Sequence, residues 1–366
     1  MDIMDQYYME RTLNLAAKGK GLVSPNPMVG AVLVNNGQIV GEGYHKAAGG
    51  PHAEVFCLQE AGHLAKNATL YVSLEPCSHY GRTPPCTEAI IRAGVSTVIV
   101  AMEDPNPLIS GRGIKLLRDK GIEVVTGVME EEAKALNEIF IKYITTKKPF
   151  VAVKVASTLD GKIATRIGDS KWITGPMARE YVHQLRNEYD SILVGINTVL
   201  ADNPSLNCRI NSPTKRDPIR IVLDSKLRIP LDAKVINSSS SAPLIVFTNA
   251  NNQEKVKELA EKGVEVIEQK GETRISIDFV MAKLAQRQIS SVLVEGGSDV
   301  IWSFFQENFV DKYYMFIAPK IIGGREGVPL IGGDGIEIMN NAIKMKWKET
   351  RFLGDDLLLT CYRELF

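Results

Sequence analysis

Three side chains that can bind zinc follow one another in the first quarter of the sequence. His52 offers a nitrogen ligand, and Cys77 and Cys86 offer two sulfur ligands. Three protein ligands leave the fourth position of a tetrahedral zinc ion to water, which is typical of catalytic rather than structural sites. Bound zinc makes hydroxide available near neutral pH. The set therefore predicts a hydrolytic zinc centre.

A carboxylate lies two residues after the first of these ligands. Glu54 falls near the expected start of a helix, where it can take a proton from water and deliver it to a leaving amine. Cys86 directly precedes the expected helix "TEAIIRAG", whose N-terminal dipole favours a thiolate. The order H-x-E, then P-C, then C is the signature of zinc deaminases that act on cytosine- or adenine-like rings. A buried histidine with two inert cysteines is the alternative interpretation.

The elements that must position these residues alternate between helix and strand. Four residues near the N-terminus recur at helical spacing: Met4, Tyr8, Thr12 and Leu15. The expected elements that follow are a hairpin over 29–45, helices over 53–62 and 87–94, and strands over 68–77 and 95–105. Short helices between strands predict an α/β layer with a mixed or parallel sheet.

The length of 366 residues favours about two domains. A polar connector from about Thr145 to Pro149 marks the expected boundary, which gives domains of residues 1–147 and 148–366. Strand-like segments from "FVAVKVAS" to "SSVLVEGG" alternate with helical ones in the second half, and "KYYMFIAPKII" and "DDLLLTCYR" are expected to close its sheet. Both domains are therefore predicted to be α/β.

Charge and cysteine usage exclude several classes of protein. Lys and Arg number 43, as do Asp and Glu, and no basic stripe suited to nucleic acid is evident. Five cysteines form no regular disulfide framework. The acidic N-terminal segment does not resemble a signal peptide, and no apolar run has the length of a membrane span. We expect a cytoplasmic protein that binds a small molecule and neither nucleic acid nor a membrane.

The spacing of the two thiols departs from the common deaminase pattern P-C-x-x-C, because "SHYGRTPP" separates them. This loop, with "SPNPMVGAVLV", "GYHKAAGGPHAE" and "EDPNPLISGRGI", resembles the bifunctional deaminase/reductase family of riboflavin biosynthesis over essentially the whole chain. The resemblance implies a cytidine-deaminase-like α/β/α domain that deaminates 2,5-diamino-6-ribosylamino-4(3H)-pyrimidinone 5′-phosphate with zinc. The implied pocket residues are Asn26, His45, His79, Arg82 and Asn106.

The second half carries no G-x-G-x-x-G, so a Rossmann dinucleotide site is not indicated. A glycine pair in "SSVLVEGGSDVIWSFF" lies where a strand turns into a helix, and backbone N–H groups there can hold a phosphate. "KVASTLDGKIA", "GDSKWITG" and "NTVLADNPSLNCR" resemble the reductase half of the same family. That half is like dihydrofolate reductase, uses NADPH to reduce the ribosyl group to ribityl, and forms homo-oligomers, so a dimer or tetramer is expected.

The same resemblance assigns residues to the second domain. Implied cofactor contacts are Ala156, Trp172, Thr198, Asp202, Ser225 and Gly297. Implied substrate contacts are Lys154, Ser170, Arg186, Leu206, Arg209 and Glu295. Paired arginines such as Arg186 and Arg209 suit a phosphate, and Lys154 with Glu295 is our hypothesis for proton delivery. Three alternatives stay open: a surface charge for Arg186, a core position for Trp172 and a turn position for Asp202. His183 receives no role.

Two other functions stay open. A nucleic-acid deaminase with a fused binding module would share the H-A-E motif, but the balanced charge and the "SHYGRTPP" loop count against it. A zinc-stabilised scaffold would need no proton carrier, and Glu54 counts against that.

Overall fold

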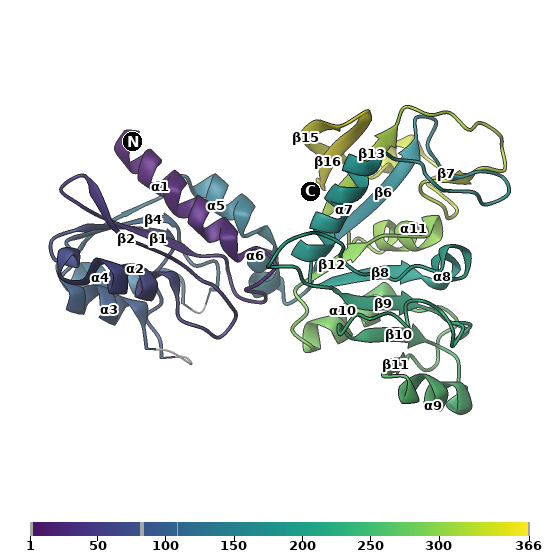
Figure 1. The fold of residues 1–366 in the computed structure, drawn as a ribbon, viewed down its shortest axis with the longest axis horizontal. Coiled ribbons are helices and arrows are strands. Elements are labelled where there is room, and N and C mark those ends of the chain that lie inside the picture. The colour runs from purple at the N-terminus through teal and green to yellow at the C-terminus, as the bar shows by residue number, and fades with distance from the viewer. Residues whose placement is uncertain (1–2, 81–83, 108, 365–366) are drawn as a thin grey trace. The chain divides into compact units, whose positions relative to one another are not determined.

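Two mixed sheets organise the chain in the computed structural model, which describes residues 3–80, 84–107 and 109–364 (Figure 1). The chain divides into two compact units, Met1–Lys147 and Lys148–Phe366. Each unit has hydrophobic core clusters of its own. Within the described ranges, no helix has the length and apolar character needed to cross a membrane.

The first unit is a three-layer α/β/α structure. Its sheet has the order β2-β1-β3-β4-β5, with β1 antiparallel to both neighbours and β3, β4 and β5 parallel. The strands are β1 (Gly30–Asn35), β2 (Gln38–Tyr44), β3 (Thr69–Leu74), β4 (Thr97–Met102) and β5 (Glu123–Thr126). The helices are α1 (Ile3–Ala16), α2 (Ala53–Ala61), α3 (Cys86–Ala93), α4 (Arg112–Asp119), α5 (Glu130–Leu136) and α6 (Glu138–Thr146).

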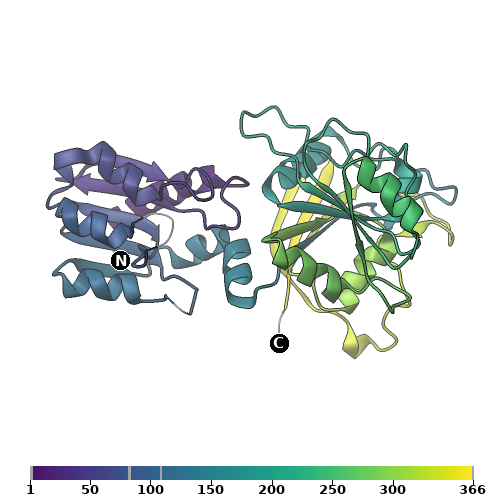
Figure 2. The same ribbon diagram turned by 90° about the horizontal axis from the view of Figure 1, so that it is seen from below.

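Helices cover both faces of this sheet. Figures 1 and 2 show α2, α3 and α4 side by side on one face, with α1 and α5 on the other. Strands β3 and β4 are buried along almost their whole length, as expected for parallel strands covered on both sides. The continuous apolar runs that predicted these strands follow from that double burial.

Helix α2 packs directly onto the backbone of β2. A Cβ atom at Gly43 would lie 2.3 Å from the carbonyl oxygen of Ala53, and one at Gly41 would lie 2.3 Å from that of Cys57. Only glycine permits such an approach, because the helix backbone occupies the space that a side chain would need. The helix that carries Glu54 is therefore fixed against the sheet.

The second unit is built on a nine-stranded sheet of order β11-β10-β9-β8-β12-β6-β13-β16-β15. Its strands are β6 (Phe150–Thr158), β8 (Ser191–Gly195), β9 (Ile219–Leu223), β10 (Leu244–Thr248), β11 (Val264–Glu268), β12 (Ser291–Val294), β13 (Lys312–Ala318), β15 (Met345–Leu353) and β16 (Asp356–Arg363). A separate two-stranded sheet pairs β7 (Lys162–Ala164) with β14 (Val328–Pro329). The helices are α7 (Pro176–Glu188), α8 (Ile196–Asp202), α9 (Gln253–Glu261), α10 (Ile277–Gln286) and α11 (Ser298–Gln306).

Alternate residues of the central strands enter two different cores. Leu193 of β8 packs in the cluster that includes residues of α10 and α11, whereas Val194 packs in the cluster that includes residues of α8 and α9. This is the period of two expected for a strand whose faces are both covered. Strands β13 and β16 pair antiparallel and extend the sheet, as the sequence predicted for their segments.

Candidate active sites

The three predicted zinc ligands lie together in the first unit. Nδ1 of His52 lies 3.2 Å from Sγ of Cys86 and 3.5 Å from Sγ of Cys77, and the three ligand atoms all lie within 4.8 Å of one another. Tetrahedral zinc with ordinary Zn–N and Zn–S bonds places a nitrogen and a sulfur ligand about 3.5 Å apart. The donor set and its spacing therefore fit a zinc ion.

Local structure explains how the three ligands meet. His52 is the N-cap residue of α2, and Cys86 is the first residue of α3 rather than the residue before it. The backbone N–H of Cys86 donates to Sγ of Cys77 at 3.3 Å, and both the N–H and the hydroxyl of Thr87 donate to the carbonyl oxygen of Cys77 at 3.2 Å. A hydrogen bond from the Cys86 thiol, and after it one from His52, lowers the pKa of Cys77 below its ordinary value, although burial opposes this.

Glu54 lies in the first turn of α2 and is 3% exposed. Its Oε2 atom is buried and has no hydrogen-bond partner among the described residues. Burial, and after it the charge of Cys77, raises the pKa of this carboxyl above its ordinary value. A buried carboxylate oxygen without a partner, next to a metal-ligand group, is suited to accept a proton from a reacting water.

A cavity of about 170 Å³ opens beside these residues. Its lining residues are Asn26, Pro27, Val29, His45, His52, Glu54, Leu74, Glu75, Cys77, His79, Asp104 and Phe140. Asn106, which the resemblance places in the pocket, is not among them; its N–H donates to Oδ1 of Asp104 at 2.8 Å. Arg82 lies outside the described residues. Asp104, Glu75 and Phe140 are cavity residues that the sequence alone did not indicate.

A short hydrogen-bond chain orients Asn26 in this cavity. Nδ1 of His45 lies 3.0 Å from the carbonyl oxygen of Pro51 and therefore donates to it. The other ring nitrogen, Nε2, then accepts from Nδ2 of Asn26 at 3.2 Å. Burial lowers the pKa of His45, which favours this neutral form. His45 therefore fixes the amide nitrogen of Asn26 at the wall of the cavity.

Asn137, at the junction of α5 and α6, fixes the loop that carries Asn26. Its Oδ1 accepts from the N–H of Met28 at 2.8 Å, and its Nδ2 donates to the carbonyl oxygen of Met28 at 3.0 Å. Asn137 is 1% exposed. Its amide satisfies both backbone hydrogen-bonding groups of Met28, as a neighbouring strand would do in a sheet.

We expect Asn137→Ala to destabilise the first unit by roughly 2–4 kcal/mol, because it leaves a backbone donor and a backbone acceptor of Met28 without partners. Hydrogen–deuterium exchange followed by mass spectrometry should show faster exchange over residues 24–30. Asn14→Ala in the same unit is the matched control, because Asn14 is exposed on α1. Unchanged exchange over 24–30 in Asn137→Ala would contradict the expectation.

The second unit contains a larger cavity of about 450 Å³. It is lined by most of the residues that the resemblance assigned there: Lys154, Ala156, Ser170, Trp172, Arg186, Thr198, Asp202, Leu206, Arg209 and Glu295. Gly297 and Ser225 are not among the lining residues. Gly297 is the N-cap of α11 with φ of 74°, so the glycine pair does lie at a helix start.

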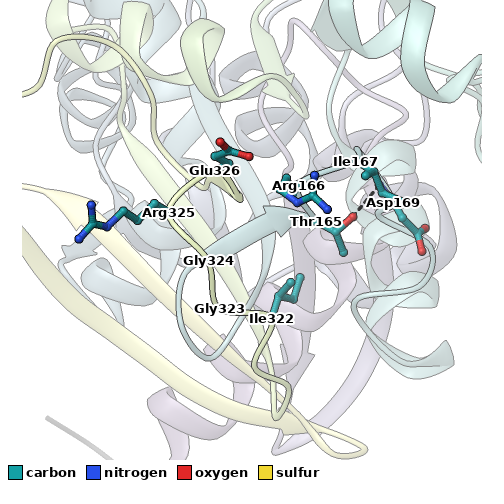
Figure 3. Close-up of a pocket in the computed structure, with 9 residues that line it drawn as sticks. All are labelled: Thr165, Arg166, Ile167, Asp169, Ile322, Gly323, Gly324, Arg325 and Glu326. Atoms are coloured by element: carbon teal, nitrogen blue, oxygen red, sulfur yellow. Dashed lines mark hydrogen bonds between the residues drawn. The ribbon is translucent and has the colours of Figure 1, made fainter.

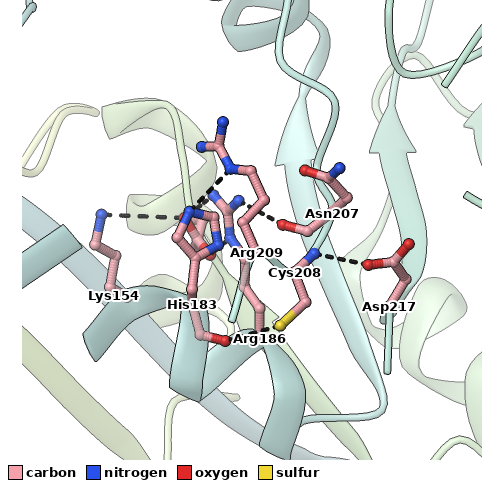
Figure 4. A network of polar contacts seen from close by, with 8 residues as sticks. Lys154, His183, Arg186, Asn207, Cys208, Arg209 and Asp217 are labelled. Carbon is pink, nitrogen blue, oxygen red and sulfur yellow. Dashed lines mark hydrogen bonds and ion pairs between the residues drawn. The ribbon is translucent and has the colours of Figure 1, made fainter. Parts of the chain in front are cut away.

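Three of the lining residues, Lys154, Arg186 and Glu295, form a buried ionic network, and Figure 4 shows the polar contacts around it. Glu295, which directly follows β12, accepts two hydrogen bonds from Arg186, at 2.6 Å from Nε and 2.8 Å from Nη2. Nζ of Lys154 lies 4.0 Å from the same carboxylate. Burial lowers the pKa of Lys154, and the charge of Glu295 partly opposes this. Arg186 is therefore buried and is not a surface charge, which excludes the alternative interpretation. Two of the N–H donors of Arg186 are already occupied by the carboxylate of Glu295.

Arg209 is held differently from Arg186. Its Nε donates to Nε2 of His183 at 3.1 Å, and its two terminal nitrogens point away from the network (Figure 4). Burial, and after it the charges of Arg186 and Arg209, lowers the pKa of His183 to about 4 and favours the neutral ring that accepts this bond. Of the two arginines, Arg209 is thus the better placed to bind an anion. His183 lies three residues before Arg186 on α7, so the two share one face of the helix. This spacing is the feature of the sequence that could have placed His183 in the cavity with Arg186.

Trp172 and Asp202 lie at the rim of the same cavity. Trp172 is 63% exposed and has the guanidinium of Arg179 4.6 Å from its ring centroid, which excludes a core position. Ser170 Oγ lies 3.5 Å from Oδ1 of Asp202. The polar side chains expected to contact cofactor and substrate therefore meet at one edge.

A third cavity, of about 560 Å³, lies between the loop after β7 and the loop after β13 (Figure 3). Its lining residues are Thr165, Arg166, Ile167, Asp169, Ile322, Gly323, Gly324, Arg325 and Glu326. It shares none of them with the reductase cavity. Asp160 braces its wall by accepting from the N–H groups of Ile322 and Gly323 at 3.2 and 2.8 Å. Two arginines and two carboxylates offset one another there, so no ligand charge is indicated.

Comparisons with known proteins agree with the chemistry of the cavity beside Glu54 in the first unit and of the cavity beside Glu295 in the second. The family model "Cytidine and deoxycytidylate deaminase zinc-binding region" matches residues 2–102, and the model "RibD C-terminal domain" matches residues 149–359. A zinc-binding deaminase region is thus joined to a reductase-type domain in one chain.

Relatives are similar over almost the full length. RibD of Aquifex aeolicus is 51% identical over 97% of this chain and 98% of its own, and RibD of Escherichia coli is 41% identical over 98% and 99%. A solved structure of Acinetobacter baumannii RibD (form 1) has a TM-score of 0.89 at 39% identity and covers 99% of both chains. A Thermotoga maritima structure, described as a diaminohydroxyphosphoribosylaminopyrimidine deaminase/5-amino-6-(5-phosphoribosylamino)uracil reductase, has a TM-score of 0.88 at 41% identity and covers 98% of this chain and 99% of its own.

The chain belongs to the RibD family of riboflavin biosynthesis. Membership confirms the bifunctional enzyme, the cytidine-deaminase-like and dihydrofolate-reductase-like α/β folds, and the cofactors Zn²⁺ and NADPH that the sequence predicted.

Proposed function

We propose that the unit Met1–Lys147 deaminates 2,5-diamino-6-ribosylamino-4(3H)-pyrimidinone 5′-phosphate, and that the unit Lys148–Phe366 then reduces the ribosyl group of the product to ribityl. The observation that carries the first assignment is the group of His52, Cys77 and Cys86 beside the unpaired buried oxygen of Glu54. The activities in the name of the Thermotoga maritima relative support the substrate and the order.

In the first unit, His52, Cys77 and Cys86 would hold Zn²⁺, which would act as a Lewis acid and make water nucleophilic near neutral pH. Glu54 takes a proton from the attacking water and delivers it to the leaving amine. Asn26, oriented by His45, presents its amide oxygen to the donors of the pyrimidine ring. We assign His79, Arg82 and Asn106 to the same substrate.

In the second unit, bound NADPH would supply the hydride. Arg209 binds the substrate phosphate, and Lys154 and Glu295 shape proton delivery at the sugar. We assign Ser170, Arg186 and Leu206 to the substrate as well. Cofactor contacts are assigned to Ala156, Trp172, Thr198, Asp202, Ser225 and Gly297. The protein's task here is to align the sugar carbon with the nicotinamide and to exclude other orientations.

Mass analysis of the aminated pyrimidine ribosyl phosphate tests the function directly. Zinc-replete protein should exchange an amino group for oxygen without NADPH, and the product should gain two hydrogens when NADPH is added. His52→Ala should abolish the first change and leave the second intact when the deaminated compound is supplied. Absence of both changes with the wild-type protein would overturn the proposal.

We also propose that the protein is a cytoplasmic homo-oligomer. None of the five cysteines, all of them among the described residues, forms a disulfide, as is usual in a reducing compartment. Strand β15 forms one edge of the nine-stranded sheet and exposes Trp347 and Phe352, a surface that a second copy would cover. Light scattering after size exclusion should give more than one chain per particle for the wild type and a smaller particle for Trp347→Lys. A monomeric wild type would overturn the proposed assembly.

A further inference from the structure

Glu75 is a buried carboxylate in the deaminase cavity that the catalytic roles above do not use. It directly follows β3, is 6% exposed and lies two residues before Cys77. Its N–H donates to the carbonyl oxygen of Met102 at 3.0 Å, which continues the pairing of β3 with β4 by one residue.

Both oxygens of Glu75 accept backbone hydrogen bonds, one from the segment that joins β4 to α4 and the other from the first turn of α4. Oε2 accepts from the N–H groups of Asp104 and Gly111 at 3.1 and 2.9 Å. Oε1 accepts from those of Gly113 and Ile114 at 2.8 and 3.3 Å. A carboxylate has about four lone-pair positions, so these four donors account for its capacity.

This bonding distinguishes Glu75 from Glu54, although both carboxylates line the same cavity. Glu54 has a buried oxygen without a partner in the described part of the chain, whereas each Glu75 oxygen already accepts two N–H groups. A carboxylate occupied in this way is not available to accept a proton from water. Glu75 is therefore not a second general base.

The four bonds place Glu75 at the start of α4. The N-cap residue of that helix, Gly111, has φ of 76° and supplies no side-chain cap. The carboxylate of Glu75 satisfies N–H groups of the first turn in its place, where a negative charge is favoured by the helix dipole. Gly113 makes the contact possible, because a Cβ atom there would lie 2.0 Å from the carbonyl oxygen of Pro76.

The segment that Glu75 holds is also the one that reaches the substrate cavity. Asp104 lines the cavity and accepts from the N–H of Asn106 at 2.8 Å. On its other side, Glu75 is linked through Pro76 to the zinc ligand Cys77. One side chain therefore sets the distance between the metal-binding segment and the loop that carries Asp104 and Asn106.

We propose that Glu75 is a positioning residue for the deaminase substrate, and that it acts by holding the Asp104–Asn106 loop against the metal-binding segment. The proposal rests on the assignment of deamination to the first unit. The loop is expected to move when the carboxylate is lost, while the three zinc ligands, which are anchored by α2, α3 and Thr87, keep their places.

Glu75→Gln tests the proposal, because the amide keeps the volume but turns two N–H donors towards backbone N–H groups. We expect KM for deamination to rise roughly 10- to 100-fold and kcat to change by less than about threefold. Zinc content should stay at the wild-type level, and reduction of the deaminated compound by the same chain should be unchanged. Hydrogen–deuterium exchange should accelerate over residues 109–114.

Glu103→Gln is the matched control, because Glu103 is an exposed acid on the same loop. It should leave KM and exchange as in the wild type. Glu75→Asp keeps the charge but shortens the reach, so it should retain zinc and raise KM by less than Glu75→Gln does. The positioning role would be overturned if neither Glu75→Gln nor Glu75→Asp raised KM. It would also be overturned if these two variants lost zinc in proportion to their loss of activity. A wild-type protein without deaminase activity would instead overturn the proposed function, and the exchange measurement would still test the hold on the loop.

Discussion

Glu54→Gln is expected to lower the deaminase kcat by about 10²- to 10⁴-fold, which is the usual contribution of a general acid–base group. Glutamine keeps the shape of the side chain but cannot take a proton from water or return one to the leaving amine. His52, Cys77 and Cys86 are untouched, so the zinc content should remain that of the wild type. Turnover in zinc-replete protein, measured beside metal content, checks both parts.

The control for this prediction is Glu60→Gln, the same change on the same helix at an exposed residue outside the cavity. It should leave turnover unchanged, and NADPH-dependent reduction should be unaffected in both variants. Loss of zinc from Glu54→Gln would show a structural role at the metal centre. Normal turnover with normal zinc would remove Glu54 from proton transfer.

Glu295→Gln is expected to destabilise the second unit by about 3–5 kcal/mol, because it leaves two buried cations without their compensating charge. The side chains of Arg186 and Lys154 are only 14% and 16% exposed, and that of Glu295 is 5% exposed. All three tryptophans, Trp172, Trp302 and Trp347, lie in the second unit. Urea unfolding followed by tryptophan fluorescence therefore reports on this unit selectively.

An exposed ion pair in the same unit provides the comparison. Glu265 pairs with Arg287 where both side chains are at least a third exposed, so Glu265→Gln should change the unfolding free energy by less than about 1 kcal/mol. Equal effects from the two substitutions would contradict the energetic importance of the buried network. Hydride transfer that is undiminished in Glu295→Gln would separately remove Glu295 from the proposed proton delivery.

The pH dependence of stability should also differ between wild type and Glu295→Gln. Burial alone raises the pKa of Glu295, but the charge and hydrogen bonds of Arg186, with the charge of Lys154, hold it below its ordinary value of 4.5. A lowered pKa in the folded state stabilises the fold above the ordinary value, and that stabilisation is lost as the pH falls through the folded value. Below pH 4.5, the wild type should therefore lose unfolding free energy more steeply than the variant.

The grouping of three possible metal ligands could be predicted from the sequence because zinc chemistry is specific to few residue types. His52, Cys77 and Cys86 stand out even though 24 and 8 residues separate them in turn. Strands such as β3 and β8 could also be predicted from the sequence, because burial on both faces makes them continuous apolar runs. Strand β15 was missed because its residues are almost all exposed and leave no apolar pattern.

Contacts between distant segments could not be predicted. The bond of Asn137 to Met28 joins residues 109 positions apart, and the sequence pattern around either one gives no sign of it. The pairing of Arg186 with Glu295 also joins distant residues and could not be predicted either. Because Glu295 occupies Arg186, the expected phosphate contact shifts towards Arg209. Such contacts depend on how finished elements pack, whereas local patterns report only the elements themselves.

The close packing of α2 on the backbone of β2 at Gly41 and Gly43 also determines which parts of the site can change in sequence. A helix that rests on a strand's backbone has no freedom to slide, so changes of sequence elsewhere leave the frame of the metal centre in place. Connecting loops in general tolerate insertions better than packed elements do, and eight residues join Cys77 to Cys86. A connecting loop can therefore change in length without moving the helix that carries Glu54.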